Sequence, residues 1–178
     1  MAPPGEVDGR ARLRLGAYLF VASGVSIAII GWVAMVTHSP LVFPSLGPSA
    51  FMLFVAPLIV ESSPRNVFCG HLIGVLCGAL ALIVFGLLYV RPDLEDLTWQ
   101  RIGAVTLSLA LTLAVMTWLG VQHAPAAATT LIVGLGLIHD PVHMVTMMVA
   151  VVALIVIAAV INRIHGVRTP LWSPFPAD

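Results

Sequence analysis

Four long apolar stretches constrain this chain more than any other feature. They cover residues 15–36, 64–90, 101–121 and 141–161, and each matches the roughly 20 residues that a helix needs to cross a bilayer core about 30 Å thick. The chain is 60% hydrophobic and only 9% charged, whereas a soluble domain carries about 25% charged residues. Its polar side chains are too few to cover a surface in water, so we predict an all-α integral membrane protein in contact with the lipid bilayer.

The charged residues indicate which side of the membrane the start of the first helix faces. Acidic and basic residues number eight each, so no electrostatic argument favours a nucleic-acid partner. Arg10, Arg12 and Arg14 precede the first apolar stretch, which indicates a cytoplasmic N-terminus. That stretch is longer than the apolar region of a signal peptide, and no cleavage site of small residues follows it. We therefore expect a retained first helix and a location in a bacterial inner (plasma) membrane.

The two cysteines are expected to pack rather than to bond. Cys69 and Cys77 lie eight residues apart in one apolar stretch, which is roughly 12 Å along a helix. The Cα atoms of a disulfide lie within about 7 Å of each other. These two residues therefore cannot bridge each other, and we interpret them as small packing residues.

Two shorter apolar stretches, residues 48–60 and 125–138, lie between the long ones. A helix of about 14 residues covers only about 20 Å, which is less than the bilayer core. We therefore predict two short half-helices that begin at Pro48 and Pro125. Neither Gly47 nor Ala124, the residues before them, offers a side-chain oxygen to cap a helix. The long helices that follow do have such caps: Ser63 precedes Pro64, and Asp140 precedes Pro141.

The order of these stretches indicates a pseudo-repeat. Shifting the first half by 77 positions places Pro48 on Pro125 and Pro64 on Pro141. Each half then reads as a long helix, a break, a short helix and a second long helix. In chain order, we predict an N-terminal cytoplasmic tail 1–14, a first membrane repeat 15–90, a polar loop 91–100, a second membrane repeat 101–163 and a C-terminal tail 164–178.

Two topologies fit this pattern. If the short helices are re-entrant, the chain has four crossings, and Arg65 faces the outside. If each short helix crosses with its extended flanks, there are six crossings in two inverted halves, and Arg65 faces the cytoplasm. The arginines lie mostly inside in both cases, seven to one and six to two. We favour re-entry, because residues 125–138 are too short to cross after a full-length helix.

Helix starts inside a membrane have a specific consequence. The first amides of a helix lack partners within it and carry partial positive charge, and inside a bilayer they must be satisfied. A small anion or a water-filled cavity is one partner, as in transporters with broken helices. Neighbouring carbonyls or buried waters are the alternative.

Polar residues near these helix starts are the candidate substrate-binding residues. His123 directly precedes Pro125, and His71 lies about 10 Å along the third long helix, where it needs a cavity or a partner. The same residues could equally hold helices together through hydrogen bonds, and hydroxyls often only bond their own i−4 carbonyl. The full candidate set is His123, His71, Asn66, Arg65, Ser45, Ser49, Pro125, Thr129 and Thr130.

The sequence offers no case for an enzyme. It contains no phosphate-binding loop, no Cys-x-x-Cys pair and no nucleophile motif, so we expect no cofactor and no catalytic residue. His139 and His143 have the i, i+4 spacing of a metal pair, but without a third ligand we interpret them as solvated residues. Gly70, Gly74 and Gly78 form a row of small residues that lets another helix approach closely. With the small size of the chain, this row suggests a homo-oligomer.

Three segments together resemble the HPP family of membrane proteins. "HAPAAATTL" (residues 123–131) resembles the His-Pro-Pro signature, "PSLGPSAFMLFVAP" (44–57) resembles a small-residue segment of the family, and "PRNVFCGHLIG" (64–74) resembles its Pro-Arg-Asn stretch. Ala124 replaces the first proline of the signature, and Ala126 and Ala127 replace small or glycine positions. The regulatory CBS domains that some members append are not in this chain.

The resemblance implies a four-helix membrane fold and, from chloroplast and cyanobacterial members, transport of nitrite. We therefore expect a channel or transporter for a small monovalent inorganic anion such as nitrite, passing near the starts of the two half-helices. Channel, symporter and exchanger stay open, and a histidine, whose unperturbed pKa is about 6.5, leaves proton coupling open as well. The alternative function is a membrane scaffold or sensor subunit without transport.

Overall fold

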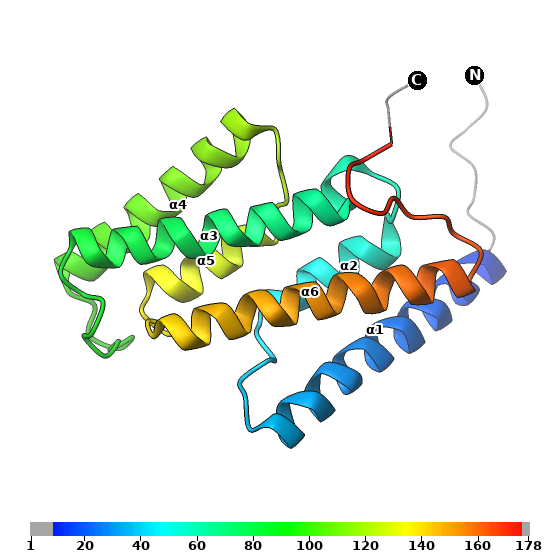
Figure 1. Ribbon diagram of the computed structural model, residues 1–178, viewed down its shortest axis with the longest axis horizontal. Helices are drawn as coiled ribbons and strands as arrows, with labels where there is room; N and C mark the ends of the chain where they lie inside the picture. Colours follow the sequence, from blue (N-terminus) through cyan, green and yellow to red (C-terminus); the bar gives the residue numbers. More distant parts are fainter. Residues whose placement is uncertain (1–8, 176–178) are drawn as a thin grey trace.

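The computed structural model of the protein describes residues 9–175, which form helices and connecting segments without a strand (Figure 1). The elements in chain order are α1 (Gly9–Thr37), α2 (Leu46–Val55), the 3₁₀ turn η1 (Val60–Ser62), α3 (Pro64–Val84), α4 (Trp99–Leu119), α5 (Ala126–Gly134) and α6 (Pro141–Ile164). Four of these helices, α1, α3, α4 and α6, are long and apolar enough to cross a membrane. The prediction of an all-α membrane protein with four long and two short helices is confirmed.

Helix boundaries differ from the predicted ones by several residues. Helix α1 begins at Gly9, so Arg10 to Arg14 belong to the helix and not to a tail. The remainder of that expected tail, residues 1–8, and the last three residues of the expected C-terminal tail lie outside the described residues. Helix α3 ends at Val84 rather than at residue 90, because the chain turns through Gly86 in the left-handed region, with φ of 67°.

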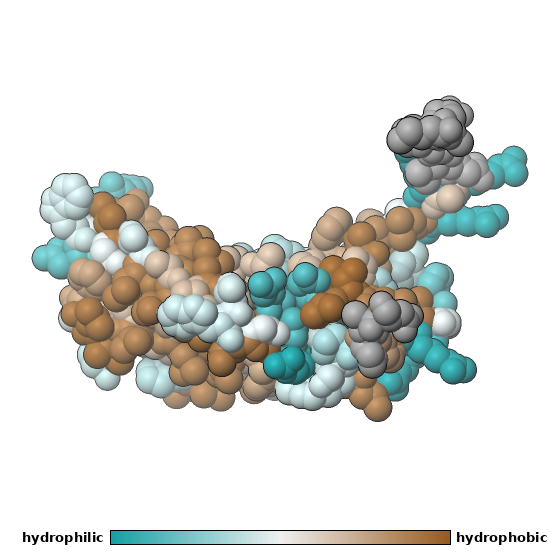
Figure 2. Space-filling view, turned by 90° about the horizontal axis from the view of Figure 1, so that it is seen from above, coloured by the Kyte–Doolittle hydropathy of each residue, from teal (hydrophilic) through white to brown (hydrophobic). Residues whose placement is uncertain are grey.

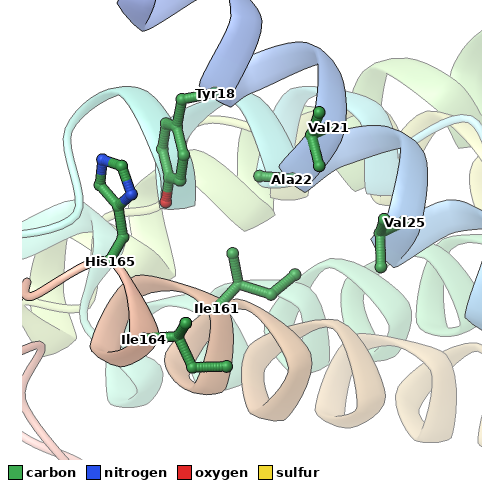
Figure 3. A pocket seen from close by; sticks show the side chains of 7 residues that line it. All are labelled: Tyr18, Val21, Ala22, Val25, Ile161, Ile164 and His165. Carbon is green, nitrogen blue, oxygen red and sulfur yellow. The ribbon is translucent and has the colours of Figure 1, made fainter.

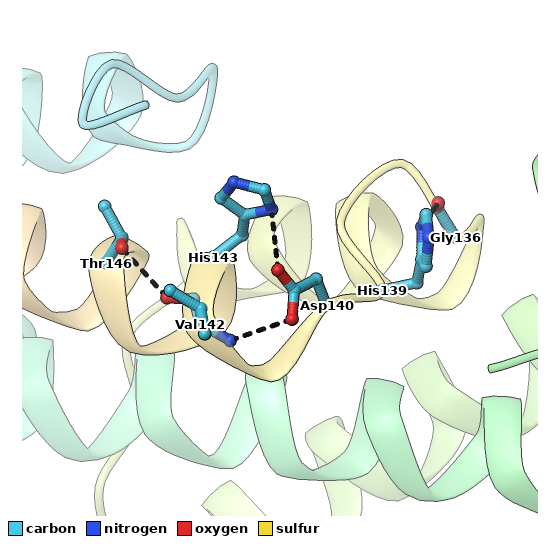
Figure 4. A network of polar contacts seen from close by, with 6 residues as sticks. All are labelled: Gly136, His139, Asp140, Val142, His143 and Thr146. Carbon is cyan, nitrogen blue, oxygen red and sulfur yellow. Dashed lines mark hydrogen bonds and ion pairs between the residues drawn. The ribbon is translucent and has the colours of Figure 1, made fainter. Parts of the chain in front are cut away.

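The two predicted helix caps are present. Ser63 accepts a hydrogen bond from the Asn66 amide with Pro64 at the first helical position, as expected for an N-cap. At the start of α6, Asp140 Oδ1 accepts from the Val142 amide over 3.2 Å, and its other oxygen lies 3.4 Å from His143 Nδ1 (Figure 4). These local signals fix where both long helices begin.

Hydrogen bonds between distant segments define one end of the bundle, which we call end A. Asn162, in the last turn of α6, accepts from Tyr18 of α1 over 2.5 Å and donates to the Leu53 carbonyl at the end of α2 over 2.9 Å. The Arg65 amide at the start of α3 donates to the Trp172 carbonyl beyond α6. End A therefore contains the starts of α1 and α3 and the ends of α2 and α6.

The opposite end, end B, joins the other helix termini. Arg101, at the start of α4, donates to the Val90 carbonyl beyond α3 over 3.0 Å, and Gly136, just after α5, lies against the same guanidinium. Helices α1, α3 and α5 thus run from end A to end B, while α2, α4 and α6 run back (Figure 1).

The re-entrant arrangement that we favoured from length is corrected by this connectivity. The chain leaves α4 at end A, where the Gln122 carbonyl accepts from Asn66, and reaches end B at Gly136 after passing through α5. The short helices therefore lead from one end to the other, as in the six-crossing alternative. The length argument counted about 1.5 Å per helical residue, whereas the extended flanking residues cover up to about 3.3 Å each.

The two half-helices match each other with a shift of 80 rather than 77. In the first, the amides of Leu46 and Gly47 donate to the carbonyls of Phe43 and Pro44; in the second, Ala126 and Ala127 donate to His123 and Ala124. The predicted starts at Pro48 and Pro125 are thus not equivalent positions. The three-residue difference has two sources: the connection from α2 to α3, which contains η1, has eight residues against six between α5 and α6, and α2 is one residue longer than α5.

Helix α5 packs directly on the glycine row of α3. A Cβ atom added at Gly74 would lie 2.8 Å from Thr130 Oγ1 and 2.9 Å from the Ala126 carbonyl, and one at Gly78 would lie 2.7 Å from Val133. The row therefore allows a close approach between helices, as predicted, but its partner is α5 of the same chain. The expected homo-oligomer loses the support of this row and stays a prediction.

The outer surface suits a lipid environment. Phe20 and Trp32 on α1 are 81% and 61% exposed, and only 17% of the apolar window of α1 is buried, against 56% for α3. Figure 2 shows apolar residues over much of one face, with hydrophilic residues at both ends of the long axis. Helix α3 is therefore central, and α1 faces the lipid.

The crossing number can be tested by side-specific labelling. In a background with Cys69→Ala and Cys77→Ala, we expect Arg65→Cys and Arg168→Cys to react with an impermeant thiol reagent from one side of the membrane. Asp93→Cys should react from the opposite side, because end A and end B face opposite surfaces. Labelling of Arg65→Cys on the side opposite to Arg168→Cys would restore the re-entrant model.

The contact between α3 and α5 predicts a stability difference between two glycines. Gly74→Ala should lower the stability by about 1–3 kcal/mol, because its methyl group would press on backbone and side chain of α5. Gly24→Ala on α1 is the control, since nothing lies within 4 Å of its Cβ position, and it should melt at or slightly above the parent temperature. Equal melting temperatures in detergent for both variants would contradict the packing described here.

Candidate polar site between the half-helices

Two histidines meet at the centre of the polar residues singled out from the sequence. His71 comes from α3 and His123 from the segment before α5, and their ring centroids lie 5.1 Å apart. Both side chains are completely buried. Gly70 makes this approach possible, because a Cβ atom there would lie 2.8 Å from Cβ of His123.

A hydroxyl group from the other half-helix connects the two rings. Ser49 Oγ, on α2, lies 2.8 Å from His71 Nε2 and 3.1 Å from His123 Nε2. On its other nitrogen, His71 Nδ1 lies 2.7 Å from Thr129 Oγ1 of α5. Ser49 and Thr129 are equivalent under the shift of 80, so each half-helix places one hydroxyl on the same imidazole. We call these four residues the His–Ser–His–Thr network.

One carbonyl determines how the hydrogens of this network are arranged. His123 Nδ1 lies 2.8 Å from the Glu61 carbonyl, which only accepts, so Nδ1 carries the hydrogen and Nε2 of the neutral ring accepts. Ser49 Oγ lies 3.1 Å from both the Ser45 carbonyl and His123 Nε2, so its single hydrogen has two acceptors. When that hydrogen is directed to His123, His71 Nε2–H donates to Ser49 and the Thr129 hydroxyl donates to His71 Nδ1. All ring nitrogens are satisfied with both imidazoles neutral.

Further polar side chains extend from this network. Thr130 Oγ1 donates to Thr112 Oγ1 of α4 over 2.9 Å and also lies 3.1 Å from the Ala126 carbonyl. Asn66 donates through Nδ2 to the Gln122 carbonyl over 3.1 Å. These contacts tie α3, α4 and α5 together around the histidines.

Two polar atoms beside the network have no hydrogen-bond partner among the described residues. They are Ser45 Oγ, at the start of α2, and Asn66 Oδ1, and both side chains are completely buried. An unpaired buried polar atom costs about 1–3 kcal/mol. Ser45 is the more informative of the two, because its hydroxyl is a hydrogen-bond donor one helical turn before Ser49.

The remaining predicted site residues lie at helix starts. Pro125 is buried and is the N-cap residue of α5, without a side-chain cap bond. Arg65 is half-buried at end A, about 9 Å along α3 from His71. The structure thus brings His71, His123, Ser49 and Thr129 together, places Thr130, Asn66 and Ser45 next to them, and leaves Arg65 apart.

The amides at the half-helix starts have partners in the same chain. The turns before α2 and α5 supply carbonyls to Leu46, Gly47, Ala126 and Ala127, and Ala128 donates to the Pro125 carbonyl. Of the two alternatives weighed for these amides, neighbouring carbonyls are the partners. The polar groups available to a ligand are therefore the side chains and not the backbone.

Arg101 is a buried charged residue that the sequence did not single out. It is 4% exposed; Nη2 donates to the Val90 carbonyl, while Nη1 has no partner among the described residues. Its burial depends on the turn at Gly136, where φ of 77° and the lack of a side chain leave room for the guanidinium. Both contacts come from segments far from Arg101 in the chain. The sequence therefore showed an arginine at a helix start but not that its side chain is buried.

A cavity of about 540 Å³ at end A is lined by Arg163, Gly166, Arg168 and Thr169, whereas two others are apolar. A pocket of about 260 Å³ lies between α1 and α6 (Figure 3), and at its edge Tyr18 stacks on His165 with ring centroids 4.2 Å apart. The rest of its lining consists of Val21, Ala22, Val25, Ile161 and Ile164. A pocket of about 500 Å³ near the two half-helix starts is lined by residues that include Pro48, Phe51 and Pro125. Neither lining suits an inorganic anion.

The two histidines at the start of α6, His139 and His143, contact only nearby residues of the chain among those the structure describes. His139 Nδ1 lies 3.0 Å from the Gly136 carbonyl, and His143 pairs with Asp140 (Figure 4). Within residues 9–175, no three His, Cys, Asp or Glu side chains are arranged to hold a metal ion. Cys69 and Cys77 are both free thiols, as predicted from their spacing.

Comparison with known families gives one match. The family model described as "HPP, transmembrane region" matches residues 9–170, which include all six helices. No curated protein and no solved structure matches the chain.

The network predicts different effects for two serines on the same helix. Ser49→Ala removes the hydroxyl between the rings and leaves histidine nitrogens unpaired, so it should lower the stability by about 1–3 kcal/mol. Ser45→Ala removes a buried hydroxyl that has no partner among the described residues; it should leave the melting temperature unchanged or raise it, because the cost of an unpaired buried group is removed. Thermal unfolding of both variants in detergent is the measurement, and equal losses would show that the network contributes nothing specific.

Proposed function

Because the chain belongs to the HPP transmembrane family, we propose that it transports a small monovalent anion, with nitrite as the first candidate. The observation that carries the proposal is the His–Ser–His–Thr network, which lies completely buried between the half-helices of a membrane bundle. Ionisable side chains are costly inside a membrane and mark substrate paths more often than other positions.

The geometry of the network supports a path for substrate. The half-helices α2 and α5 each contribute one hydroxyl to it, and both are the elements whose helical part is too short to cross a bilayer alone. Broken helices that meet near the middle of a bundle are the usual site of substrate binding in transporters with inverted repeats. The unpaired Ser45 hydroxyl can donate a hydrogen bond to an anion.

The distribution of charge supports a cytoplasmic end A. Six arginines lie at end A, namely Arg10, Arg12, Arg14, Arg65, Arg163 and Arg168, and two lie at end B, namely Arg91 and Arg101. Cytoplasmic segments carry an excess of basic residues. We therefore propose that end A, where α1 begins and α6 ends, faces the cytoplasm of a bacterium.

A scaffold or sensor subunit without transport is the second candidate. It is favoured by the closure of the network, in which each ring nitrogen already has a partner within the chain. In that case the histidines only fix the positions of helices. A homo-oligomer is compatible with both functions, and cross-linking in membranes is its direct test.

Flux measurements decide between the two functions. In liposomes that contain the purified protein, we expect uptake of nitrite above the rate of empty vesicles, with nitrate, formate and chloride measured in parallel. His123→Asn, which retains a hydrogen-bonding side chain, should lower the flux per folded molecule at least tenfold, because the imidazole lines the path. Flux of none of the four ions from well-folded protein would support the scaffold, and normal flux in His123→Asn would return this residue to a structural role.

A further inference from the structure

We propose that the network couples the anion to one proton, so that the protein is an electroneutral proton–anion symporter and not a channel. The inference rests on the proposed anion transport and concerns the same residues. Its basis is that His71 and His123, joined by Ser49, are the groups through which the buried site can gain a positive charge.

The argument begins with the charge of the empty site. An anion that leaves water for an apolar interior needs a positive partner, since an unpaired buried charge is very costly. With both imidazoles neutral, the network supplies dipoles but no charge. A proton taken up by one of the two rings supplies the missing positive charge.

Other charged groups do not replace this proton. Glu61, in η1, accepts a hydrogen bond from His123 through its backbone carbonyl. Its side-chain carboxylate interacts with the same ring and has negative charge, so it cannot supply the positive charge that an anion needs. The residues that contact the rings from α2 and α5 are the hydroxyls of Ser49 and Thr129, which do not titrate in the physiological range. Arg101 is buried, but its guanidinium lies at end B against Val90 and Gly136. The titratable group that His71 faces is the imidazole of His123, with ring centroids 5.1 Å apart.

The hydrogen bonds of the network persist when one ring gains a proton. An imidazolium donates from both nitrogens, and the partners of both rings are hydroxyl or carbonyl oxygens, which accept. If His71 is protonated, Nε2 donates to Ser49 and Nδ1 donates to Thr129, whose hydroxyl hydrogen turns away. If His123 is protonated, Nε2 donates to Ser49 while Nδ1 continues to donate to Glu61.

The stoichiometry follows from the separation of the rings. Two imidazolium ions with centroids 5.1 Å apart would repel each other in a buried site. One proton therefore enters with one anion, binds a ring nitrogen without forming a bond to the anion, and leaves with it at the other side. The net charge that crosses the membrane is zero.

Two driving forces of equal size separate a symporter from a channel. Proteoliposomes are given either a gradient of one pH unit, acid outside, at zero membrane potential, or a tenfold potassium gradient with valinomycin that makes the inside positive. Nitrite is the probe, and the rate of empty vesicles is subtracted because undissociated nitrous acid crosses lipid. We expect protein-dependent uptake to respond to the pH gradient alone, with one proton entering per nitrite by an internal pH dye.

Each other outcome has a defined meaning. Uptake driven by the potential alone would overturn the symport while leaving anion transport in place, and a response to both forces would overturn the stoichiometry of one proton. No protein-dependent nitrite uptake with either force would defeat the proposed function together with this inference.

Substitutions test whether the histidines hold the proton. His71→Gln and His123→Gln keep a side chain that can form hydrogen bonds but cannot take up a proton, so the pH-driven uptake should fall at least tenfold. His139→Gln is the matched control, since this ring lies at end B, where its Nδ1 bonds the Gly136 carbonyl, and it should retain the parent rate. Rates are normalised to monodisperse protein, and unchanged pH-driven uptake in both network variants would overturn the assignment.

Discussion

The close approach of α5 to α3 is the contact on which the rest of the structure depends. Three glycines on α3 bring the backbone of α5 so near that a single methyl group at Gly74 would collide with it. Without a hydrophobic force between helices in lipid, such backbone proximity is a main source of association. The same approach places His123 beside His71 and brings the Thr129 hydroxyl within hydrogen-bond distance of His71 Nδ1. One packing surface therefore determines both the fold and the polar site.

Inversion of the two halves explains why the site has contributions from both. Helices α1 and α3 run in one direction, and α4 and α6 in the other (Figure 1), so the half-helices approach the centre from opposite ends. Ser49 and Thr129 are equivalent residues of the two halves and bond different nitrogens of one imidazole. A single histidine on α3 thus breaks the symmetry of the repeat, because the equivalent residue of α6 under the shift of 77 is Met148.

Local chemistry was visible in the sequence, and long-range geometry was not. Ser63 with Pro64 and Asp140 with Pro141 predicted two helix starts, because a cap depends only on neighbouring residues. The prediction that the short helices are re-entrant was wrong. Their path depends on extended flanking segments, and composition does not reveal how long these segments are. The shift of 80 was hidden by two coincident prolines and by the greater length of α2 and of the connection that follows it. His71 and His123 were selected separately, but their pairing through Ser49 requires the fold.

The distribution of positive charge separates two kinds of site in this protein. Arg101 carries a permanent charge, and the structure places it at an end of the bundle, where the Val90 carbonyl accepts one of its hydrogen bonds. The centre contains histidine, whose charge depends on whether a proton is bound. A permanent charge at the centre would hold an anion too firmly to release it, because attraction is strong where the dielectric constant is low. In the proposed symport, a ring that gains and loses its charge together with the anion gives binding and release from the same site.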